Sequence, residues 1–134
     1  MKYMLDTNIC IYIIKNKPKQ VIEKFSCLDS SEICISSISY AELLYGAEKS
    51  RKVERNKLSL AYFLSAITIR DFGQAAAAEY GRIRAELEKE GQPIGAMDML
   101  IAAHAKSEGL ILVTNNTREF CRVKSLEVEN WVNI

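Results

Sequence analysis

The sequence is poor in the residues that build metal sites from nitrogen and sulfur. His104 is the only histidine among 134 residues, and no two cysteines form a C-x-x-C pair. Structural zinc sites need four Cys or His ligands at short regular spacings, so this pattern excludes one. It also gives no disulfide framework, and we expect the cysteines to be buried free thiols in a reducing cytosol. They are Cys10, Cys27, Cys34 and Cys121.

An excess of charge of either sign is also missing. The chain has 18 Lys and Arg against 17 Asp and Glu, a net charge of +1. No overall field therefore attracts a polyanion, and nucleic-acid binding would have to rest on local basic patches. No apolar run approaches the roughly 20 residues of a membrane span. Asp6 interrupts the first apolar stretch before it reaches the length of a signal-peptide core, so we expect a cytoplasmic protein without membrane contact.

What the sequence does contain is an ordinary globular composition, with 49% hydrophobic and 26% charged residues. Short apolar runs alternate with segments of helical periodicity, which is typical of a parallel sheet covered on both faces. We predict a single domain over residues 1–134, an α/β fold built as a three-layer α/β/α sandwich, with a central mainly parallel sheet of four to five short strands. Predicted strands cover residues 3–5, 33–35, 67–69, 110–113 and 126–128. Predicted helices cover residues 9–16, 19–28, 36–49, 58–66, 73–90 and 96–107, with a helical turn at 118–120.

A carboxylate directly follows the first predicted strand. Tyr3, Met4 and Leu5 run into Asp6, and burying an uncompensated carboxylate costs several kcal/mol. Asp6 should therefore lie at the open end of the strand, facing solvent or a cation.

Three further acids fall at the same edge of the predicted sheet. Glu42 lies in the first turns after the second strand, Asp98 opens an otherwise apolar helix, and Glu119 lies in the turn after the fourth strand. Ligands bind beyond the carboxyl ends of parallel strands. Carboxylates converging there are the ligands that Mg²⁺ or Mn²⁺ prefers, so we predict a divalent metal site.

Each acid also has a simpler interpretation. Asp6 could be only a helix N-cap, and Asp98 could cap its own helix. Glu42 could be a solvated helix residue, and Glu119 could form a surface ion pair with a neighbouring arginine. The four acids together favour the metal site more than any one of them does.

Several polar residues beside these acids could hold a carboxylate or order water, although capping and turn roles are alternatives. They are Thr7 and Asn8, then Ser37, and then Thr114, Asn115 and Asn116. His104 lies on an apolar helix, where we expect a packed core or dimer-surface histidine rather than a catalytic base.

Four blocks of the sequence resemble those of a PIN domain, and more narrowly the VapC toxins of bacterial toxin–antitoxin pairs. Any one block is weak, but four in order at matching spacing are specific, and the resemblance extends over essentially the whole chain. The blocks are MLDTN (residues 4–8), AEL (41–43), DMLIAAHA (98–105) and VTNNTREF (113–120), supported by YGAEKS (45–50) and PIG (93–95).

The resemblance implies a metal-binding core of Asp6, Glu42 and Asp98. Many PIN domains carry an aspartate soon after the threonine of the last motif, where this chain has Asn116. We assign Glu119 as the fourth acid, which leaves open whether one or two metal ions are used.

The resemblance also implies a function, the Mg²⁺- or Mn²⁺-dependent hydrolysis of RNA. Several toxins of the family cut tRNA in or near the anticodon stem-loop. A cognate antitoxin would bury apolar surface on the helices between Ile9 and Leu64 and place a basic side chain in the acidic site. Homodimers and toxin–antitoxin hetero-oligomers are usual in the family. Candidate phosphate contacts are Lys49, Arg51, Arg84 and Arg118, with Lys15, Lys17, Lys52, Arg55, Arg82 and Arg122 as further cations.

Other classes of protein fit less well. A phosphatase of the haloacid dehalogenase type needs a second aspartate where Asn8 stands, and a phospho-receiver domain needs an additional acidic pair and a later lysine. A catalytically weak PIN-like domain that binds RNA or protein remains the alternative. The intact Asp6, Glu42 and Asp98 argue against it, and Asn116 argues faintly for it.

Overall fold

The structure is a computed structural model, and it describes residues 1–133. Helices and strands alternate along the chain as the sequence predicts. The elements are β1 (Tyr3–Leu5), α1 (Thr7–Ile14), α2 (Lys19–Ser26), the 3-10 helix η1 (Ser30–Glu32), β2 (Ile33–Ser36), α3 (Ser37–Glu48), α4 (Val53–Leu64), β3 (Thr68–Arg70), α5 (Gln74–Lys89), α6 (Ala96–Ser107), β4 (Ile111–Val113), α7 (Thr117–Phe120) and β5 (Val128–Glu129). In this described part of the chain, no helix is long and apolar enough to cross a membrane.

The five strands form one sheet in the order β3-β2-β1-β4-β5, and every neighbouring pair is parallel. Leu5 of β1 lies opposite Ile35 of β2 on one side and Val113 of β4 on the other. The chain moves outward from β1 in one direction through β2 and β3, and then in the other through β4 and β5. The carboxyl end of β1 is therefore the switch point of the sheet, where α/β folds bind their ligands.

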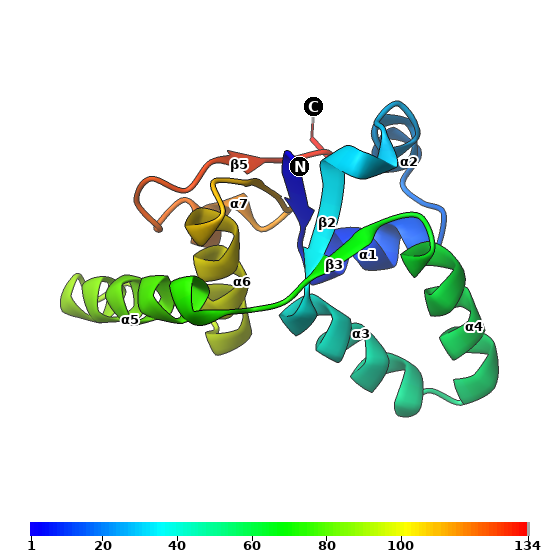
Figure 1. Cartoon of the computed structure of the whole chain (residues 1–134), viewed down its shortest axis with the longest axis horizontal. Helices are drawn as coiled ribbons and strands as arrows, with labels where there is room; N and C mark the ends of the chain where they lie inside the picture. Colours follow the sequence, from blue (N-terminus) through cyan, green and yellow to red (C-terminus); the bar gives the residue numbers. More distant parts are fainter. Residues whose placement is uncertain (134) are drawn as a thin grey trace.

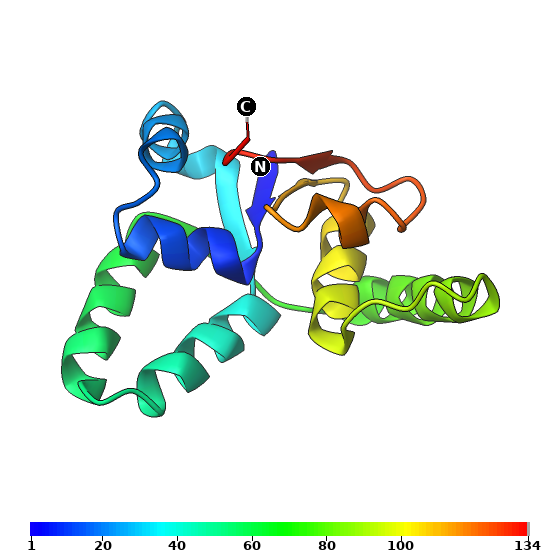
Figure 2. The same cartoon turned by 180° about the vertical axis from the view of Figure 1, so that it is seen from behind.

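Helices cover both faces of the sheet, which confirms the three-layer α/β/α prediction (Figure 1). Met4 and Leu112 point into a core formed with α5 and α6, whereas Leu5 and Val113 point into a second core formed with α1, α2 and α4. This is the two-residue alternation of strands buried on both sides. Seen from behind, α3 and α4 run outward and back as a helical hairpin beside α1 (Figure 2).

Several predicted boundaries were wrong. The first helix begins at Thr7, two residues early, because Asp6 rather than Thr7 or Asn8 is its N-cap. The helix predicted at 58–66 begins at Val53, and its charged first turns are held by an ion pair of 2.9 Å between Lys57 and Glu48 of α3. The last strand is Val128–Glu129 rather than 126–128.

The prediction of buried cysteines holds for two of the four. Cys10 and Cys34 are buried, and burial raises the pKa of both thiols, that of Cys34 to about 12. Cys27 and Cys121 are exposed, so the prediction was wrong for them. Each of these two follows the last turn of a short helix, at a position that faces away from the core.

Candidate active site

Asp6 lies at the carboxyl end of the central strand and is only 4% exposed. Its Oδ1 accepts a hydrogen bond of 2.9 Å from the backbone N–H of Ile9, so it caps α1. Burial raises the pKa of Asp6 to about 6, and the nearby charges of Asp98 and Glu42 raise it further, although hydrogen bonds from Thr114 and Ile9 oppose them. The N-cap interpretation is thus correct, but the raised pKa indicates that capping does not fully offset the cost of burying the carboxylate.

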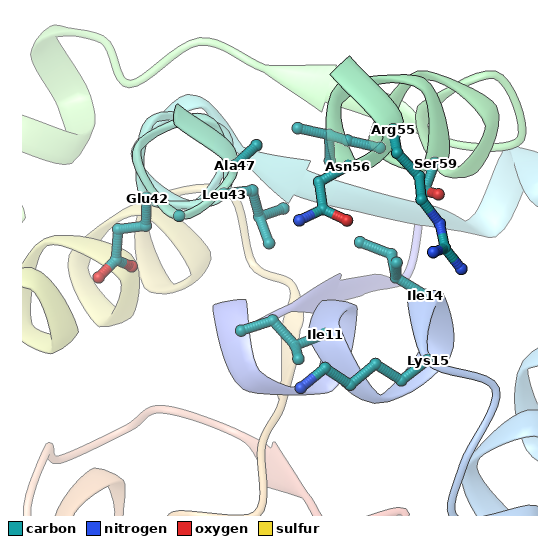
Figure 3. Close-up of a pocket in the computed structure, with 11 residues that line it drawn as sticks. Ile11, Ile14, Lys15, Glu42, Leu43, Ala47, Arg55, Asn56 and Ser59 are labelled. Carbon is teal, nitrogen blue, oxygen red and sulfur yellow. The ribbon is translucent and has the colours of Figure 1, made fainter. Parts of the chain in front are cut away.

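Glu42 is oriented by Thr7, which follows Asp6 in the chain. Thr7 Oγ1 lies 2.5 Å from Glu42 Oε1 and 3.2 Å from Ser39 Oγ, one turn earlier in α3. Glu42 is partly buried, and it lies at one end of a cavity of about 430 Å³ between α1, α3 and α4 (Figure 3). A hydrogen-bonded, partly buried carboxylate is not the solvated helix residue of the simpler interpretation.

Asp98 lies in the first turn of α6, whose N-cap residue is Gly95. No side chain forms a capping hydrogen bond there, so Asp98 does not cap its own helix. The side chain is half-buried, and burial raises the pKa of its carboxyl, with further increases from the charges of Glu119 and Glu42. The helix N-terminus favours a negative charge at this position, which partly offsets the cost of burial.

Glu119 is held by Asn116, the residue that follows Asn115 in the turn after β4. Asn116 Nδ2 donates a hydrogen bond of 3.0 Å to Glu119 Oε2, and the backbone N–H of Asn116 donates one of 2.9 Å to Thr114 Oγ1. Arg122 donates to the carbonyl of Pro93. Within residues 1–133, Glu119 forms no ion pair with an arginine, so the surface ion pair of the simpler interpretation is absent.

The four carboxylates therefore come together from four separate elements at the switch point of the sheet. The charges of Asp98 and Glu42 contribute to the raised pKa of Asp6, and those of Glu119 and Glu42 contribute to the raised pKa of Asp98, as expected for neighbouring carboxylates. Across the described residues, none of the four is paired with a lysine, arginine or histidine. A group of partly buried, unpaired acids is the arrangement that a divalent cation stabilises.

The model of the PIN domain family matches residues 3–126 of this sequence. The chain belongs to the PIN-domain family. Among known relatives of this PIN domain, the tRNA(fMet)-specific endonuclease VapC of Shigella flexneri is 54% identical over 131 residues, which are 98% of each chain. Ribonuclease VapC2 of Haemophilus influenzae is 54% identical over 132 residues, 98% of this chain and 99% of the relative. The likeness to VapC ribonucleases therefore extends over the full length.

Solved structures of the family agree with this fold. The DNA-bound VapBC complex of Salmonella typhimurium superposes with a TM-score of 0.93 at 49% identity, and covers 98% of both chains. VapBC2 of Rickettsia felis, bound to a DNA fragment from its promoter, gives a TM-score of 0.92 at 47% identity, with 98% of this chain and 99% of that chain covered.

The donor chemistry of the PIN-domain site fits Mg²⁺ or Mn²⁺, since all four candidate ligands are carboxylates. Residues 1–133 contain no group of three or more acids, histidines or cysteines arranged to hold one ion. Direct ligation of a single ion by Asp6, Glu42 and Asp98 together stays a prediction. Mg²⁺ is commonly bound through one or two carboxylates and several waters, and this arrangement suits that mode.

Three of the predicted supporting residues form no hydrogen bond with the four acids among the described residues. Asn8 is exposed on α1, Ser37 Oγ accepts a hydrogen bond of 3.0 Å from the N–H of Phe72, and Asn115 accepts one from Asn130. Thr7, Thr114 and Asn116 do contact the acids.

The predicted phosphate contacts are spread over the surface. Lys49 lies over the ring of Tyr45, 4.9 Å from its centroid, and Arg84 is engaged by Tyr80 and Glu88 on α5. Arg51 and Arg118 are exposed, and Arg118 adjoins Glu119 in the chain.

Sequence reasoning missed Ser39 and two hollows beside the acids. Ser39 precedes Glu42 by three residues, and this helical spacing could have identified it. The cavity beside Glu42 has an apolar floor, with Lys15 and Arg55 also lining it (Figure 3). A second hollow of about 560 Å³ lies between α1, α2 and α4 and is lined in part by Ile13, Phe25, Leu58, Tyr62 and Phe63.

Proposed function

We propose that this chain is a Mg²⁺- or Mn²⁺-dependent endoribonuclease that acts as the toxin of a toxin–antitoxin pair. The observation that carries the proposal is the unpaired set of Asp6, Glu42, Asp98 and Glu119 at the switch point of a PIN-domain sheet. Full-length relatives named ribonuclease support the reaction class.

The proposed substrate is a transfer RNA, cut in the anticodon region. It is supported by the Shigella flexneri relative, which is named for tRNA(fMet) and is 54% identical. Inhibition of translation would follow from loss of that RNA.

Each residue of the site would have a separate role in binding the cation and the attacking water. Asp6 and Asp98 would hold the cation, while the hydrogen bond from Thr7 keeps Glu42 in place. Asn116 would keep Glu119 in place to orient the attacking water or to support a second ion. When bound, the cation would supply a Lewis acid that lowers the pKa of water and stabilises the charge of the pentacovalent phosphate. His104 is fully buried, so we assign it no proton transfer with substrate.

We propose further that a cognate antitoxin covers the α1/α2/α4 hollow and continues into the cavity beside Glu42. Leu58 and Tyr62 on α4 are 74% and 83% exposed. Two large hydrophobic side chains exposed on one face of a helix are typical of a surface that a partner covers. The cavity beside Glu42 (Figure 3) shares Ile14 and Ser59 with that hollow, so the two adjoin. A basic side chain of the antitoxin could reach the acids along this path and take the place of the cation. Structural relatives solved as VapBC complexes support such a partner.

We also propose an assembly and a location for the protein, supported by its likeness to VapC ribonucleases and VapBC complexes. The toxin would form a homodimer, assemble with its antitoxin as a hetero-oligomer, and act in the bacterial cytoplasm, where its RNA substrate is found.

The alternative function is a catalytically weak PIN-like domain that binds RNA or protein. Asn116 is the feature that favours it, because it removes a carboxylate from the position where many relatives have one. The hydrogen bond from Asn116 to Glu119 weakens this case, since it keeps a carboxylate at the site.

One incubation separates the two functions. Purified protein is mixed with total tRNA in Mn²⁺ or in EDTA, beside the Asp6→Asn variant, and the products are resolved on a denaturing gel. We expect discrete fragments only for the unchanged protein in Mn²⁺. Intact RNA in that lane would favour the binding domain, and equal cleavage by Asp6→Asn would disprove the assigned site.

A further inference from the structure

A chain of polar side chains runs from the buried Ser36 and His104 out to Glu108 and Arg70, which are partly exposed, and it joins α3, α6 and β3. His104 Nδ1 lies 2.7 Å from Ser36 Oγ, and His104 Nε2 lies 2.6 Å from Glu108 Oε2. Arg70 extends the chain, with its Nε 2.7 Å and its Nη2 2.6 Å from Glu108 Oε1. The ring is also held from the side by Phe72, whose ring centroid lies 5.5 Å away in an edge-on arrangement.

The hydrogen-bond partners decide the direction of each bond. A carboxylate paired with Arg70 only accepts, so His104 Nε2 carries the proton given to Glu108. In the neutral ring, Nδ1 must then accept, and Ser36 is its donor. Ser36 Oγ also accepts a hydrogen bond of 3.0 Å from the backbone N–H of Ile38. Every polar atom of the ring and of the hydroxyl thus has a partner.

Ser36, His104 and Glu108 are the residue types of a hydrolase triad, but their location excludes that chemistry. Both Ser36 and His104 are 0% exposed, so no substrate can reach the hydroxyl. The ring is also bound to the serine through Nδ1 and to the acid through Nε2, and it cannot turn without breaking both bonds.

The two ends of the His104 contact belong to the two helices that carry Glu42 and Asp98. Ser36 is the N-cap residue of α3, and Glu42 lies in the second turn of that helix. His104 lies in α6, whose first turn carries Asp98, and α3 and α6 pack against each other. The bond between Ser36 and His104 therefore fixes the start of α3 against the last turn of α6. Displacing this contact would change the separation of the two carboxylates.

Stability alone is a poor reason for such a network. Replacing buried charged and polar groups by apolar residues of similar size is often neutral or stabilising, because desolvation offsets most of the attraction. A directional contact, by contrast, fixes one relative placement of two helices, and metal sites depend on small displacements of their ligands.

We propose that His104 is a positioning residue, which sets the separation of the Glu42 and Asp98 carboxylates by locking the Ser36 cap of α3 to α6. The inference rests on the proposed metal-dependent cleavage of RNA. Ser36 transmits the effect, and Glu108 with Arg70 fixes the ring from its other side.

Two substitutions of His104 each keep one of the two hydrogen bonds of the ring and remove the other. In His104→Asn the amide lies near the former Nδ1 and can keep the bond to Ser36, whereas in His104→Gln it lies near the former Nε2 and can keep only the bond to Glu108. Steady-state tRNA cleavage gives kcat and KM, Mn²⁺ binding without RNA is followed by electron paramagnetic resonance, and urea unfolding gives stability. For His104→Gln we expect a loss in kcat of about 100-fold and a weaker Mn²⁺ affinity, with KM for RNA unchanged. For His104→Asn we expect both quantities within about fivefold of the unchanged protein, at a stability no higher than that of His104→Gln.

Glu108→Ala is the second variant, because it removes the outer partner of the ring at the end of α6 without emptying the core. We expect it to lower kcat and Mn²⁺ affinity in the same direction as His104→Gln. Folded His104→Gln with unchanged kcat and Mn²⁺ binding would overturn the proposal, as would losses in both His104 variants that follow only their stability. If neither His104 variant folds, unchanged Mn²⁺ binding by Glu108→Ala would overturn it. Absence of cleavage by the unchanged protein would instead disprove the proposed function.

Discussion

The hydroxyl of Thr7 lies 2.5 Å from Glu42 Oε1, and this contact links the first turn of α1 to the second turn of α3. Thr7 directly follows Asp6, so the residue that orients one carboxylate adjoins another in the chain. The same hydroxyl lies 3.2 Å from Ser39 Oγ. A hydroxyl donates only one proton, and the short distance to a charged acceptor assigns that proton to Glu42.

Thr7→Val should therefore lower cleavage without unfolding the protein. Valine keeps the shape of threonine but leaves Glu42 without its donor, and we expect kcat to fall about 10- to 100-fold, the range seen when residues that orient metal ligands are changed. Thr7→Ser keeps the hydroxyl and is the matched control, with kcat close to that of the unchanged protein. Steady-state cleavage of tRNA in Mn²⁺ measures both, and equal rates for valine and serine would show that the hydrogen bond has no role.

Asp6→Asn and Asp98→Asn should each abolish cleavage while the fold remains. Loss of one metal ligand removes several kcal/mol of transition-state stabilisation, a fall of at least about 100-fold. Circular dichroism and urea unfolding check the fold. Asp71→Asn, at an exposed position on the chain after β3, is the control and should cleave normally. Equal activity in Asp98→Asn would remove that residue from the site.

The fold was largely predictable because its signals are local. The three central strands are short, mostly apolar, buried runs, most helices have one buried face, and the parallel arrangement follows from their alternation. Element ends were less predictable, because they depend on distant contacts. The pairing of Lys57 with Glu48 extends α4, for example, and nothing in the sequence around residue 53 indicates that pairing.

The positions of the four acids near the carboxyl ends of strands were predictable, but their hydrogen-bond partners were not. The bond from Thr7 to Glu42 spans 35 residues, and the bond from His104 to Ser36 spans 68. Such pairs depend on how helices cross, which periodicity does not determine. The prediction of buried cysteines was wrong for Cys27 and Cys121 for a related reason. An apolar neighbour in the sequence does not determine whether a residue at the C-cap of a helix lies in the core.

Substitution of Tyr62 should separate antitoxin binding from catalysis. Tyr62 is exposed on α4 and lines the hollow away from the acids, so Tyr62→Ala should keep full cleavage. We expect affinity for the antitoxin to fall by about 2 kcal/mol, roughly 30-fold in Kd, as for a buried aromatic anchor. Calorimetry with the cognate antitoxin measures it, and Ser65→Ala, just beyond α4, serves as the control. An unchanged Kd would place the antitoxin elsewhere.

Basic residues that contact phosphates should make the affinity for tRNA depend on salt concentration. Arg118→Gln should reduce the slope of log K against log[salt] for tRNA binding by about one, because one fewer counterion is released. The control is Lys19→Gln, whose side chain is 88% exposed and faces Glu23 on α2. Binding is measured in EDTA, so that RNA is not cut, and a slope equal to that of the control would exclude Arg118 as a phosphate contact.

Without metal, the contribution of Asp6 to the free energy of unfolding should decrease as the pH rises. A salt-bridged carboxylate, whose pKa is lowered, shows the opposite dependence. The pKa of Asp6 is about 6 in the folded protein and 3.8 ordinarily, so between these values the folded state holds a proton that the unfolded state has lost. Stability is therefore greatest below about pH 4 with respect to this group, and it falls as the pH rises through 6, by roughly 3 kcal/mol in total. The raised pKa of Asp98 acts in the same direction.

Urea unfolding in EDTA between pH 4.5 and 7.5 measures this effect. Other carboxylates with lowered pKa, such as Asp29 and Glu79, contribute the opposite slope, so the difference between the unchanged protein and Asp6→Asn isolates the Asp6 contribution. We expect Asp6→Asn to gain stability relative to the unchanged protein as the pH rises. Mn²⁺ should remove that advantage at pH 7.5, because the cation stabilises the charged site only where Asp6 remains a carboxylate. Parallel pH curves for the two proteins would show that Asp6 ionises as freely in the fold as in the unfolded chain.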